Sequence, residues 1–594
     1  MTGLAGDPTQ SVTADGRLKT LNQAGFLDGS DCVVAARVSR LVGEDVAGDA
    51  ALALAFAVRA VRDGSTGLSL ESVAEITTDP DDDEGSPDED RPRTAGSAVE
   101  LPEAGMWLES LRSSPLVTEG VLRLELGLVY LDRYHADERL IADSFRARRT
   151  APVTPVDPAV EKLVGANTLD DAQRAAVRCV VESATTVLTG GPGMGKTHTI
   201  ASVLQALGAG SGHALRMGLA APTGKAAARM NEMLRGVLDN DLSISPAVTL
   251  HRLLGSKPGN SQRFKHDARN PLPHDVVVID EASMVSLSMM ARLIEALPLT
   301  TRLLLVGDPD QLASVEAGSV LADLVRGLEV DGSVVRLTTD HRLHDDRAGL
   351  AQAFRNGDAE AVLTAIDIAT KGVEFIETSE PSIDLLPQVV EHTEQLRELA
   401  LNGDADAALA HLKQSRLLCA HRTGPYGTRH WNQLIEQGLA ERAPEVSMQT
   451  MYVGRPILVT RNDYGLGVNN GDTGVIIRAQ GGPIAVIETG SGILRLSPWR
   501  LSDIETMHAM TVHKAQGSQV ANVVVLVPPP GSRLLTREML YTAVTRAQHH
   551  LTIVGSREAI RHAVQAPAQR SSGLAQRLTQ LRPTKRDPVE SPDP

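Results

Sequence analysis

A glycine-rich segment at residues 190–197, GGPGMGKT, combines the residue types that hold a nucleotide triphosphate. It matches the pattern G-x-x-x-x-G-K-[ST] between a short apolar run and a helical pattern. Glycine lets the backbone turn its N–H groups toward phosphate, the lysine reaches the terminal phosphates, and the threonine hydroxyl binds Mg²⁺. We predict an ATP site whose residues are Gly190, Gly191, Pro192, Gly193, Met194, Gly195, Lys196, Thr197 and His198.

Two adjacent carboxylates, Asp280 and Glu281, follow the apolar run at residues 276–279. Such a pair is common at strand ends, and its position after a phosphate loop in one α/β unit is what favours a functional role. In that setting the first acid holds Mg²⁺ through water. The second acid is placed to orient and deprotonate the attacking water. We therefore predict that Asp280, with Thr197, belongs to the metal site and that Glu281 is the catalytic base.

A third polar segment, GDPDQ at residues 307–311, follows the apolar run at 303–306. The amide of Gln311 both donates and accepts hydrogen bonds, which suits a side chain that senses a γ-phosphate. The alternative is an ordinary polar loop. Three strands that end in polar loops at one edge of a sheet favour the catalytic interpretation.

The elements that must position these residues alternate between short apolar runs and helical patterns. The runs at 186–188, 216–220, 276–279 and 303–306 predict buried parallel strands with helices on both faces. We assign residues 166–332 to this first α/β domain, and 333–447 with 509–565 to a second one. Residues 448–508 between its two parts show short strands and turns, including Asn469-Asn-Gly-Asp472, and predict a small β insertion.

The outer parts of the chain carry no catalytic cluster. Residues 1–115 show a mainly helical pattern, interrupted by the acidic segment 79–94, which lacks aliphatic residues and is predicted to be disordered. A connecting segment at 116–165 contains a strand pattern at 122–130 and a helical pattern at 132–145. The tail at 566–594 is rich in proline, arginine and serine and is also predicted to be disordered.

Composition limits the class of protein without naming a partner. A chain of 594 residues predicts about three to five domains. The net charge of −16 is unfavourable for binding phosphate, although a groove can be locally basic on an acidic body. Three widely spaced cysteines, no signal-peptide pattern and no long apolar run predict an intracellular, cytoplasmic protein.

Nine segments of the chain resemble, in order and spacing, the motifs of superfamily 1 helicases. They are DDAQRAAV (170–177), GGPGMGKT (190–197), AAPTGKAA (220–227), TLHRLL (249–254), DEAS (280–283), GDPDQLASVEAG (307–318), LTTDHR (337–342), TVHKAQGSQ (511–519) and YTAVTRAQ (541–548). The set is most similar to the RecD branch, the alpha subunit of exodeoxyribonuclease V, and covers about residues 170–550. The resemblance implies two RecA-like P-loop NTPase domains, a helical N-terminal domain and an SH3-like β insertion.

The same resemblance implies further roles. Gln173 would read the adenine edge, and Arg342 and Arg546 would reach the γ-phosphate from the second domain, where a guanidinium stabilises charge on the transferring oxygens. Residues 255–273 would form the insertion that splits the duplex, with Phe264 as a weak candidate for base stacking. DNA contacts would be made by Pro222, Thr223, Lys225, Thr249, His251, Thr511, His513 and Lys514. For the lone His251, a structural role is the more frequent alternative.

The sequence thus predicts an ATP- and Mg²⁺-dependent 5′-to-3′ DNA helicase. By resemblance it is the motor subunit of a RecBCD-type helicase–nuclease with RecB-like and RecC-like partners, to which residues 1–115 would dock. We find no separate nuclease constellation, so the nuclease would belong to a partner chain. Two alternatives stay open: a stand-alone RecD-like helicase, and a regulatory ATPase that binds DNA without unwinding it. The first usually carries helix-hairpin-helix repeats, for which no repeated Gly-x-Gly hairpin is visible here.

Overall fold

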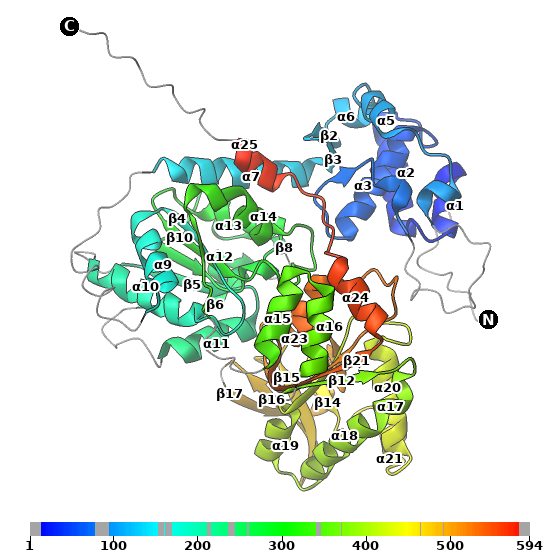
Figure 1. Ribbon diagram of the computed structural model, residues 1–594, viewed down its shortest axis with the longest axis vertical. Helices are drawn as coiled ribbons and strands as arrows, with labels where there is room; N and C mark the ends of the chain where they lie inside the picture. The colour runs from blue at the N-terminus through cyan, green and yellow to red at the C-terminus, as the bar shows by residue number, and fades with distance from the viewer. Residues whose placement is uncertain are drawn as a thin grey trace.

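The computed structural model describes residues 14–77, 94–151, 160, 169–210, 215–235, 244–257, 260–339, 346–369, 371–463, 465–490 and 492–580. Two parallel sheets form the centre of the molecule, each covered by helices (Figure 1). A helical N-terminal module lies at one side, and an antiparallel sheet lies against the second parallel sheet (Figure 1). No helix in these described ranges is both long enough and apolar enough to cross a membrane.

The first parallel sheet has six strands in the order β11-β4-β10-β9-β5-β6. Every pair within it is parallel. The strands are β4 (Thr185–Thr189), β5 (Met217–Ala221), β6 (Val248–Thr249), β9 (Val276–Ile279), β10 (Arg302–Gly307) and β11 (Val334–Arg336). The predicted parallel α/β arrangement is confirmed for this sheet, and β11 carries it a few residues past the predicted limit at 332.

Alternate residues of each strand enter two different cores. On β9, Val277 and Ile279 pack with helices α7 (Asp132–Arg149), α13 (Leu287–Ala296) and α14 (Val320–Leu328). Val276 and Val278 pack on the opposite face with α9 (Asp171–Glu182), α10 (Lys196–Gly210) and α11 (Gly224–Arg235). Burial on both faces explains why the strands are continuous apolar runs without alternation. Each fully buried valine or leucine contributes about 1.5–3 kcal/mol.

The second parallel sheet repeats this plan with five strands in the order β12-β21-β20-β13-β19. They are β12 (Val373–Glu377), β13 (Ser415–Cys419), β19 (Ala509–Thr511), β20 (Val520–Leu526) and β21 (Ala547–Gly555). The helices of this domain are α15 (Asp346–Asn356), α16 (Ala359–Ile368), α17 (Pro381–Asp384), α18 (Leu386–Leu401), α19 (Ala405–Leu412), α20 (Thr428–Ala440), α21 (Glu445–Met448), α22 (Val512–Ala515), α23 (Arg537–Val544) and α24 (Arg557–Gln565).

The β insertion is a five-stranded antiparallel sheet in the order β17-β16-β15-β14-β18. Its strands are β14 (Pro456–Val459), β15 (Thr473–Ala479), β16 (Gly482–Thr489), β17 (Gly492–Leu496) and β18 (Ile504–Thr506). It has a small core of its own that includes Ile457, Ile476 and Ile487. β15 also contacts α18 and α19, which fixes the insertion on the second domain. The SH3-like character of this sheet stays a prediction.

The N-terminal module combines helices with a three-stranded sheet in the order β1-β3-β2. It contains α1 (Gly16–Gln23), α2 (Gly29–Val42), α3 (Asp49–Arg62), β1 (Leu68–Ser69), α4 (Ala95–Ala98), α5 (Ala104–Leu111), α6 (Pro115–Thr118), β2 (Leu122–Glu125) and β3 (Leu128–Leu131). The strand pattern at 122–130 is a hairpin that turns at Leu126, whose φ is 56°. Leu116, Leu122 and Val129 belong to the module core, which therefore extends past residue 115. The predicted acidic loop lies outside the described residues, except for Thr94.

The C-terminal segment 566–580 is folded, so the prediction of a disordered tail from residue 566 is wrong for these residues. It ends in α25 (Leu574–Gln580), whose Leu574 and Leu578 are buried against α14 and α7. Figure 1 shows this helix, in red, beside α7, far from its sequence neighbours in α24. Composition misses such a segment because it is held by contacts with distant residues, which include the burial of two leucines and the bonds of Ser572, Gly573 and Arg577 to Glu138.

Candidate functional site

The three polar segments predicted from the sequence line one cavity of about 250 Å³ between the two α/β domains. The phosphate loop, Asp280, Glu281 and Gln311 come from the first domain. The second domain supplies Gly517, Gln519 and Arg546. Of the predicted nucleotide residues, Gly191, Pro192, Gly193, Gly195, Lys196, Thr197 and His198 line this cavity. The structure therefore brings most of the predicted ATP site together.

The phosphate loop connects the end of β4 to the start of α10. Gly193 and Gly195 have φ values of 92° and 79°, a region that only glycine enters without strain. The Gly190 N–H donates to the Gly307 carbonyl at 3.2 Å, which ties the loop to the end of β10. The Lys196 Nζ donates to the carbonyls of Gly190 at 2.6 Å and Gly191 at 3.0 Å. These contacts hold the lysine charge inside the loop, where terminal phosphates bind in P-loop proteins.

The acidic pair lies at the end of β9 in a strained turn. Glu281 has a φ of 52°, which is unusual for a residue with a side chain. Its N–H donates to Asp280 Oδ1 at 2.9 Å. Burial, followed by the neighbouring Glu281 charge, raises the pKa of Asp280 to about 6, while Lys196 acts to lower it. A cation next to Asp280 would favour its charged form.

The chemistry of this donor set fits Mg²⁺. Thr197 and Asp280 line the same cavity and offer a hydroxyl and a carboxylate, which are the hard oxygen ligands that Mg²⁺ takes. Mg²⁺ keeps several waters and is bound by only one or two carboxylates together with substrate phosphates. A site with few protein ligands beside a phosphate loop meets this requirement.

Gln311 and Arg546 connect the two domains within the cavity wall. Both side chains are buried, and Arg546 Nη2 donates to Gln311 Oε1 at 3.0 Å. Gln311 Nε2 donates in turn to Asp308 Oδ2 at 2.8 Å. Burial lowers the pKa of Arg546, and the charges of Glu281 and Asp308 act in the opposite direction. The charges of Glu281 and Asp308 thus help to keep this buried guanidinium protonated.

Two further hydrogen bonds fasten the domains next to this pair. The Leu312 N–H donates to Thr542 Oγ1 at 2.8 Å, and Gln516 Nε2 donates to the Leu312 carbonyl at 2.7 Å. The loop after β10 therefore carries both a cavity residue and the contact between domains. A change at the nucleotide can reach the second domain through this loop.

Gly190, Met194 and Gln173, which were predicted to belong to the ATP site, do not line the cavity. Gln173 is buried in a capping box at the start of α9, where its Oε1 accepts from the Asp170 N–H at 3.1 Å. The adenine contact of Gln173 therefore stays a prediction. Arg342 lies outside the described residues.

The three threonines predicted to contact DNA share one local structure. Thr249 and Thr511 are the last residues of their strands and Thr223 lies two residues past one. Each hydroxyl accepts from the backbone N–H three residues later, at 3.2 to 3.3 Å. A hydroxyl that caps a helix holds the backbone at the strand end in a defined position. Pro222 and Thr223 are half-buried beside Gly517 of the second domain, where a Cβ would lie 3.6 Å from Thr223 Oγ1.

Lys225 lines a larger cavity of about 750 Å³ that adjoins the nucleotide cavity. Its walls come from α11, from residues before and in β13, and from the β insertion. Arg229, Gly517, Gln519 and Arg546 line both cavities. The Lys225 residue is exposed at this cavity, and desolvation by the groups around it, followed by the charge of Arg416, lowers its pKa to about 8. Other cations along the walls are Arg235, Lys413 and Arg416.

Of the remaining predicted DNA residues, His251 is exposed, His513 is half-buried and Lys514 is already paired. Lys514 Nζ forms an ion pair with Glu505 at 2.6 Å. Burial, followed by the charge of Arg570, lowers the pKa of His513 to about 4, so this histidine is neutral at pH 7. Phe264, in β8 (Asn260–Phe264), which pairs with β7 (Ser256–Lys257), is buried 6.0 Å from the His251 ring centroid. Its proposed role in base stacking does not fit this position.

Several site residues were missed by the sequence reasoning. Arg229 lines the nucleotide cavity and donates to Gln519 Oε1 of the second domain at 3.0 Å. Asp308 and Tyr541 bond to each other across the domain boundary at 3.0 Å. Gln519, Asp308 and Tyr541 all lie inside the quoted motifs, which was an available signal. Arg229 is one turn further along α11 than Lys225, and only the fold reveals the direction in which it points.

Family models match the chain in both α/β domains. An AAA domain matches residues 173–317, and a UvrD-like helicase C-terminal domain matches residues 506–554. The "RecBCD enzyme subunit RecD" of Mycobacterium tuberculosis (strain ATCC 25618 / H37Rv) is 47% identical over 584 residues, which are 96% of this chain and 98% of that protein. The chain belongs to the RecD family. It is an ATP-dependent DNA helicase.

Other members of this group are also similar. The "RecBCD enzyme subunit RecD" of Mycolicibacterium smegmatis (strain ATCC 700084 / mc(2)155) is 46% identical over 93% of this chain and 98% of that protein. The "ATP-dependent RecD2 DNA helicase" of Deinococcus radiodurans is 31% identical over 63% of this chain and 47% of that protein. A solved structure of Bacteroides Pif1 bound to ssDNA overlaps 65% of this chain and 92% of that chain at 15% identity, with a TM-score of 0.38.

Proposed function

We propose that this RecD family member is the 5′-to-3′ motor subunit of a RecBCD-type helicase–nuclease that processes double-strand DNA breaks. The observation that carries the mechanism is the bond between Gln311 and Arg546, which makes one nucleotide cavity out of two domains. A cavity shared in this way changes shape when its ligand changes. ATP binding and hydrolysis then alternate the distance between the domains.

The chemistry of hydrolysis follows from the arrangement of the cavity. Lys196 and the loop N–H groups would bind the terminal phosphates, and Thr197 and Asp280 would hold Mg²⁺, which supplies charge neutralisation on the phosphate oxygens. Glu281 takes a proton from the attacking water. Arg546, together with Arg342, would stabilise the charge that spreads over the transferring oxygens. Gln311 lies between these groups and Asp308, so it senses the phosphate through its hydrogen bonds.

The path of single-stranded DNA is proposed along the cavity that contains Lys225. Cations on its walls suit contact with phosphates irrespective of base sequence. The same walls touch the nucleotide cavity through Gly517 and Arg229, so closure of the cleft moves DNA-contacting groups relative to one another. Thr223 and Thr511 cap helices in separate domains and do not line this cavity, so we propose that they hold the backbone beside the DNA path.

The partners are proposed to be RecB-like and RecC-like chains, since the relatives are named as subunits of the RecBCD enzyme. The nuclease centre would then belong to a partner. We place the complex in the cytoplasm, where bacterial DNA is processed. Two alternatives predict different behaviour: a stand-alone RecD-like helicase would work without partners, and a regulatory ATPase would bind DNA without separating strands.

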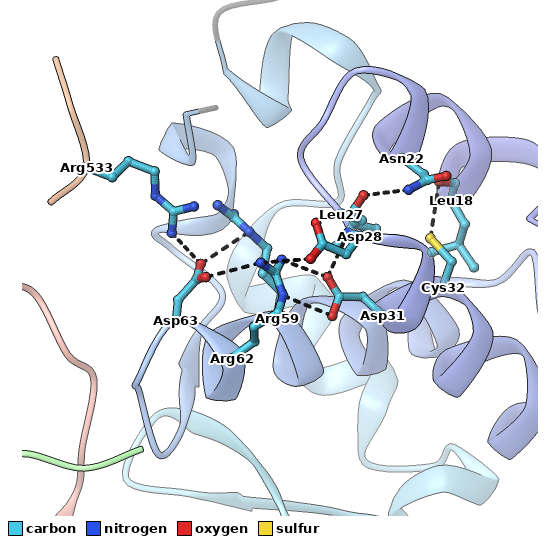
Figure 2. A network of polar contacts seen from close by, with 10 residues as sticks. All are labelled: Leu18, Asn22, Leu27, Asp28, Asp31, Cys32, Arg59, Arg62, Asp63 and Arg533. Carbon is cyan, nitrogen blue, oxygen red and sulfur yellow. Dashed lines mark hydrogen bonds and ion pairs between the residues drawn. The ribbon is translucent and has the colours of Figure 1, made fainter. Parts of the chain in front are cut away.

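The N-terminal module is proposed to make the partner contact with the outer face of α2. The module is held on its own motor by an ion pair between Asp63 and Arg533 at 2.5 Å (Figure 2). On the outer side of α2, Val33, Val34 and Leu41 are 45%, 40% and 78% exposed. Val34 and Leu41 are seven residues apart and therefore share one face of the helix, and Val33 is next to Val34 in sequence. An apolar face of this kind is suited to bury against a larger subunit.

Strand separation tests the proposal directly. Purified chain with ATP should unwind a duplex with a 5′ single-stranded tail and fail on a duplex with a 3′ tail. A matched control with a non-hydrolysable ATP analogue should show binding without unwinding. ATP hydrolysis stimulated by DNA, with no strand separation on either substrate, would favour the regulatory ATPase. Isolation from native cells without larger partner chains would favour the stand-alone helicase.

A further inference from the structure

Arg355 of α15 reaches from the second domain to the phosphate loop of the first. Its Nη2 donates to Tyr541 Oη at 2.7 Å, and its Nε forms an ion pair with Asp310 Oδ2 at 3.2 Å. The guanidinium carbon also lies 5.5 Å from the centroid of the Tyr541 ring. A Cβ placed on Gly191 would lie only 2.3 Å from Arg355 Nη2. The arginine is therefore packed against the phosphate loop without lining the nucleotide cavity.

A continuous chain of hydrogen bonds leads from Arg355 to Arg546. The Tyr541 hydroxyl donates to Asp308 Oδ2 at 3.0 Å. The same carboxylate oxygen accepts from Gln311 Nε2 at 2.8 Å, and Gln311 Oε1 accepts from Arg546 Nη2 at 3.0 Å. Arg355 and Arg546, both in the second domain, are the two ends of this network. Asp308 and Gln311, in its middle, belong to the loop after β10.

The donors and acceptors of this network permit one orientation of the glutamine. A guanidinium only donates, so the Tyr541 oxygen accepts from Arg355 and its proton must point to Asp308. A carboxylate only accepts, so the NH₂ end of Gln311 faces Asp308 and the carbonyl end faces Arg546. Burial keeps this order at neutral pH, since it raises the pKa of Tyr541 well above its usual value. If Arg355 is removed, Tyr541 loses the donor that fixes its hydroxyl.

The positive charge of Arg355 has a second effect, which is electrostatic. Asp308 and Asp310 are two acids in one short loop, and Asp308 is fully buried. Desolvation, and then Asp308, raise the pKa of Asp310 to about 6, while Arg355 acts to lower it. The guanidinium is the cation that offsets both carboxylates next to the phosphate loop.

We propose that Arg355 is a positioning residue for ATP hydrolysis, which orients Gln311 and Arg546 through Tyr541 and Asp308 and couples the phosphate loop to the second domain. It acts through other side chains and does not touch the nucleotide. The proposal concerns the ATPase cycle alone, so it does not depend on polarity or on partner chains. If Arg355 only held the two domains together, its removal would lower the melting temperature and leave kcat for ATP hydrolysis unchanged.

Measurements of DNA-stimulated ATP hydrolysis by the full chain distinguish a positioning role of Arg355 from a purely structural one. Arg355→Ala should lower kcat by about 10-fold and leave KM for ATP within about 2-fold, since the lost interaction acts on the chemical step. Arg355→Lys should recover less than half of the activity, because an ammonium cannot span Asp310 and Tyr541 as the planar fork does. The control is Arg561→Ala, which removes an exposed arginine of the same domain, paired with Glu360 at 3.0 Å. It should leave kcat and the melting temperature unchanged.

Double variants test whether Arg355 acts through the hydrogen bonds of Tyr541. Tyr541→Phe should lower kcat by a similar factor, and Arg355→Ala with Tyr541→Phe should be no slower than the slower single variant, because both break one chain. Gly191→Ala should be harmful in the parent chain and less harmful beside Arg355→Ala, where the colliding atom is gone. Unchanged kcat in Arg355→Ala, a loss in KM alone, additive losses in the first pair, or equal harm from Gly191→Ala in both backgrounds would each overturn the proposal.

Discussion

The backbone of Glu281 is strained at the point where its side chain enters the nucleotide cavity. Its backbone is held at a φ of 52°, in a region where side chains are disfavoured, at the end of a buried strand. Such strain persists only where the surroundings enforce it, and it is frequent at catalytic positions. The turn places Glu281 in the cavity that also contains Lys196.

Lys196 and Glu281 should fail in different ways. Lys196→Ala should abolish ATP hydrolysis and leave ssDNA binding within about 3-fold, because the phosphate contact is lost and the DNA groups are not. Glu281→Gln should slow hydrolysis by about 10² to 10⁴ and still bind ATP, since a proton acceptor is lost and the metal site is retained. Filter binding of ATP and single-turnover hydrolysis measure the two steps. Parental hydrolysis by Glu281→Gln would remove this residue from the base role.

Arg546 should show the sensitivity of a guanidinium at the reacting phosphate. Arg546→Ala should lower kcat by about 10³, within the range of arginine fingers. Arg546→Lys should recover little, because a single ammonium cannot reproduce the bond to Gln311 and the planar contact with phosphate at the same time. Steady-state ATPase measurements with saturating DNA test this expectation, and kcat within 3-fold of the parent in both variants would contradict it.

Lys225 should give DNA binding a dependence on pH. Its pKa is lowered to about 8, so the side chain is charged below that pH and loses its proton as the pH rises through 8. Affinity for ssDNA should therefore decline between pH 7 and 9, and the decline should be smaller in Lys225→Gln. The slope of log affinity against log salt should fall by about 0.7 in this variant, the value for one phosphate contact on a single strand. Lys371→Gln, an exposed lysine of the second domain, is the control.

Among the elements, α25 has a role that its length does not suggest. It packs on α14, where a Cβ on Gly327 would lie 2.6 Å from the Cβ of Leu578, so only glycine permits this approach. Next to it, the fully buried Glu138 of α7 accepts from Thr66, Ser572, the Gly573 N–H and Arg577. The N-terminal module, the first domain and the C-terminal segment meet at this one carboxylate.

Removal of the Glu138 carboxylate should weaken the packing between the N-terminal module, the first domain and the C-terminal segment. Glu138→Ala should lower the free energy of unfolding by about 3 kcal/mol, since it leaves buried donors and part of the Arg577 charge without a partner. Urea denaturation should show the loss, and limited proteolysis should cut within 566–580 faster. The matched control is Glu125→Ala, which removes the half-exposed acid paired with Arg577 at 2.8 Å and should cost about 1 kcal/mol or less. Equal losses in the two variants would contradict the role given to Glu138.

At the scale of the whole molecule, the N-terminal module is attached to both α/β domains and still has exposed apolar residues that a partner chain could contact. Arg533 binds Asp63 from the second domain, and the Gly318 N–H of the first domain donates to the Gly64 carbonyl at 2.9 Å. Figure 2 shows the ion pair between Asp63 and Arg533, and Val33, Val34 and Leu41 of α2 remain exposed. A module fixed in this way can transmit force between a partner and the motor.

Charges placed on that face should separate the chain from its partners. Val34→Asp combined with Leu41→Asp should leave DNA-stimulated ATPase unchanged and abolish co-purification with the larger subunits, because a buried charge in an interface is costly. Ile383→Asp, on an exposed apolar residue of the second domain, is the control. Retained assembly by the double variant would place the docking surface elsewhere on the chain.

The sequence by itself determined the ATP site, because glycine, lysine and acidic residues at those spacings serve phosphate and metal chemistry, and because strand ends of a parallel sheet meet at one edge. It also predicted roles for Gln311, from its place after a strand, and for Arg546, from the resemblance of its motif. Only the tertiary structure decided that these two bond to each other, that Arg355 reaches Gly191, that Phe264 is buried, and that residues 566–580 fold. Each of these depends on contacts between residues far apart in the chain, and local patterns carry no record of which distant surface a side chain will meet.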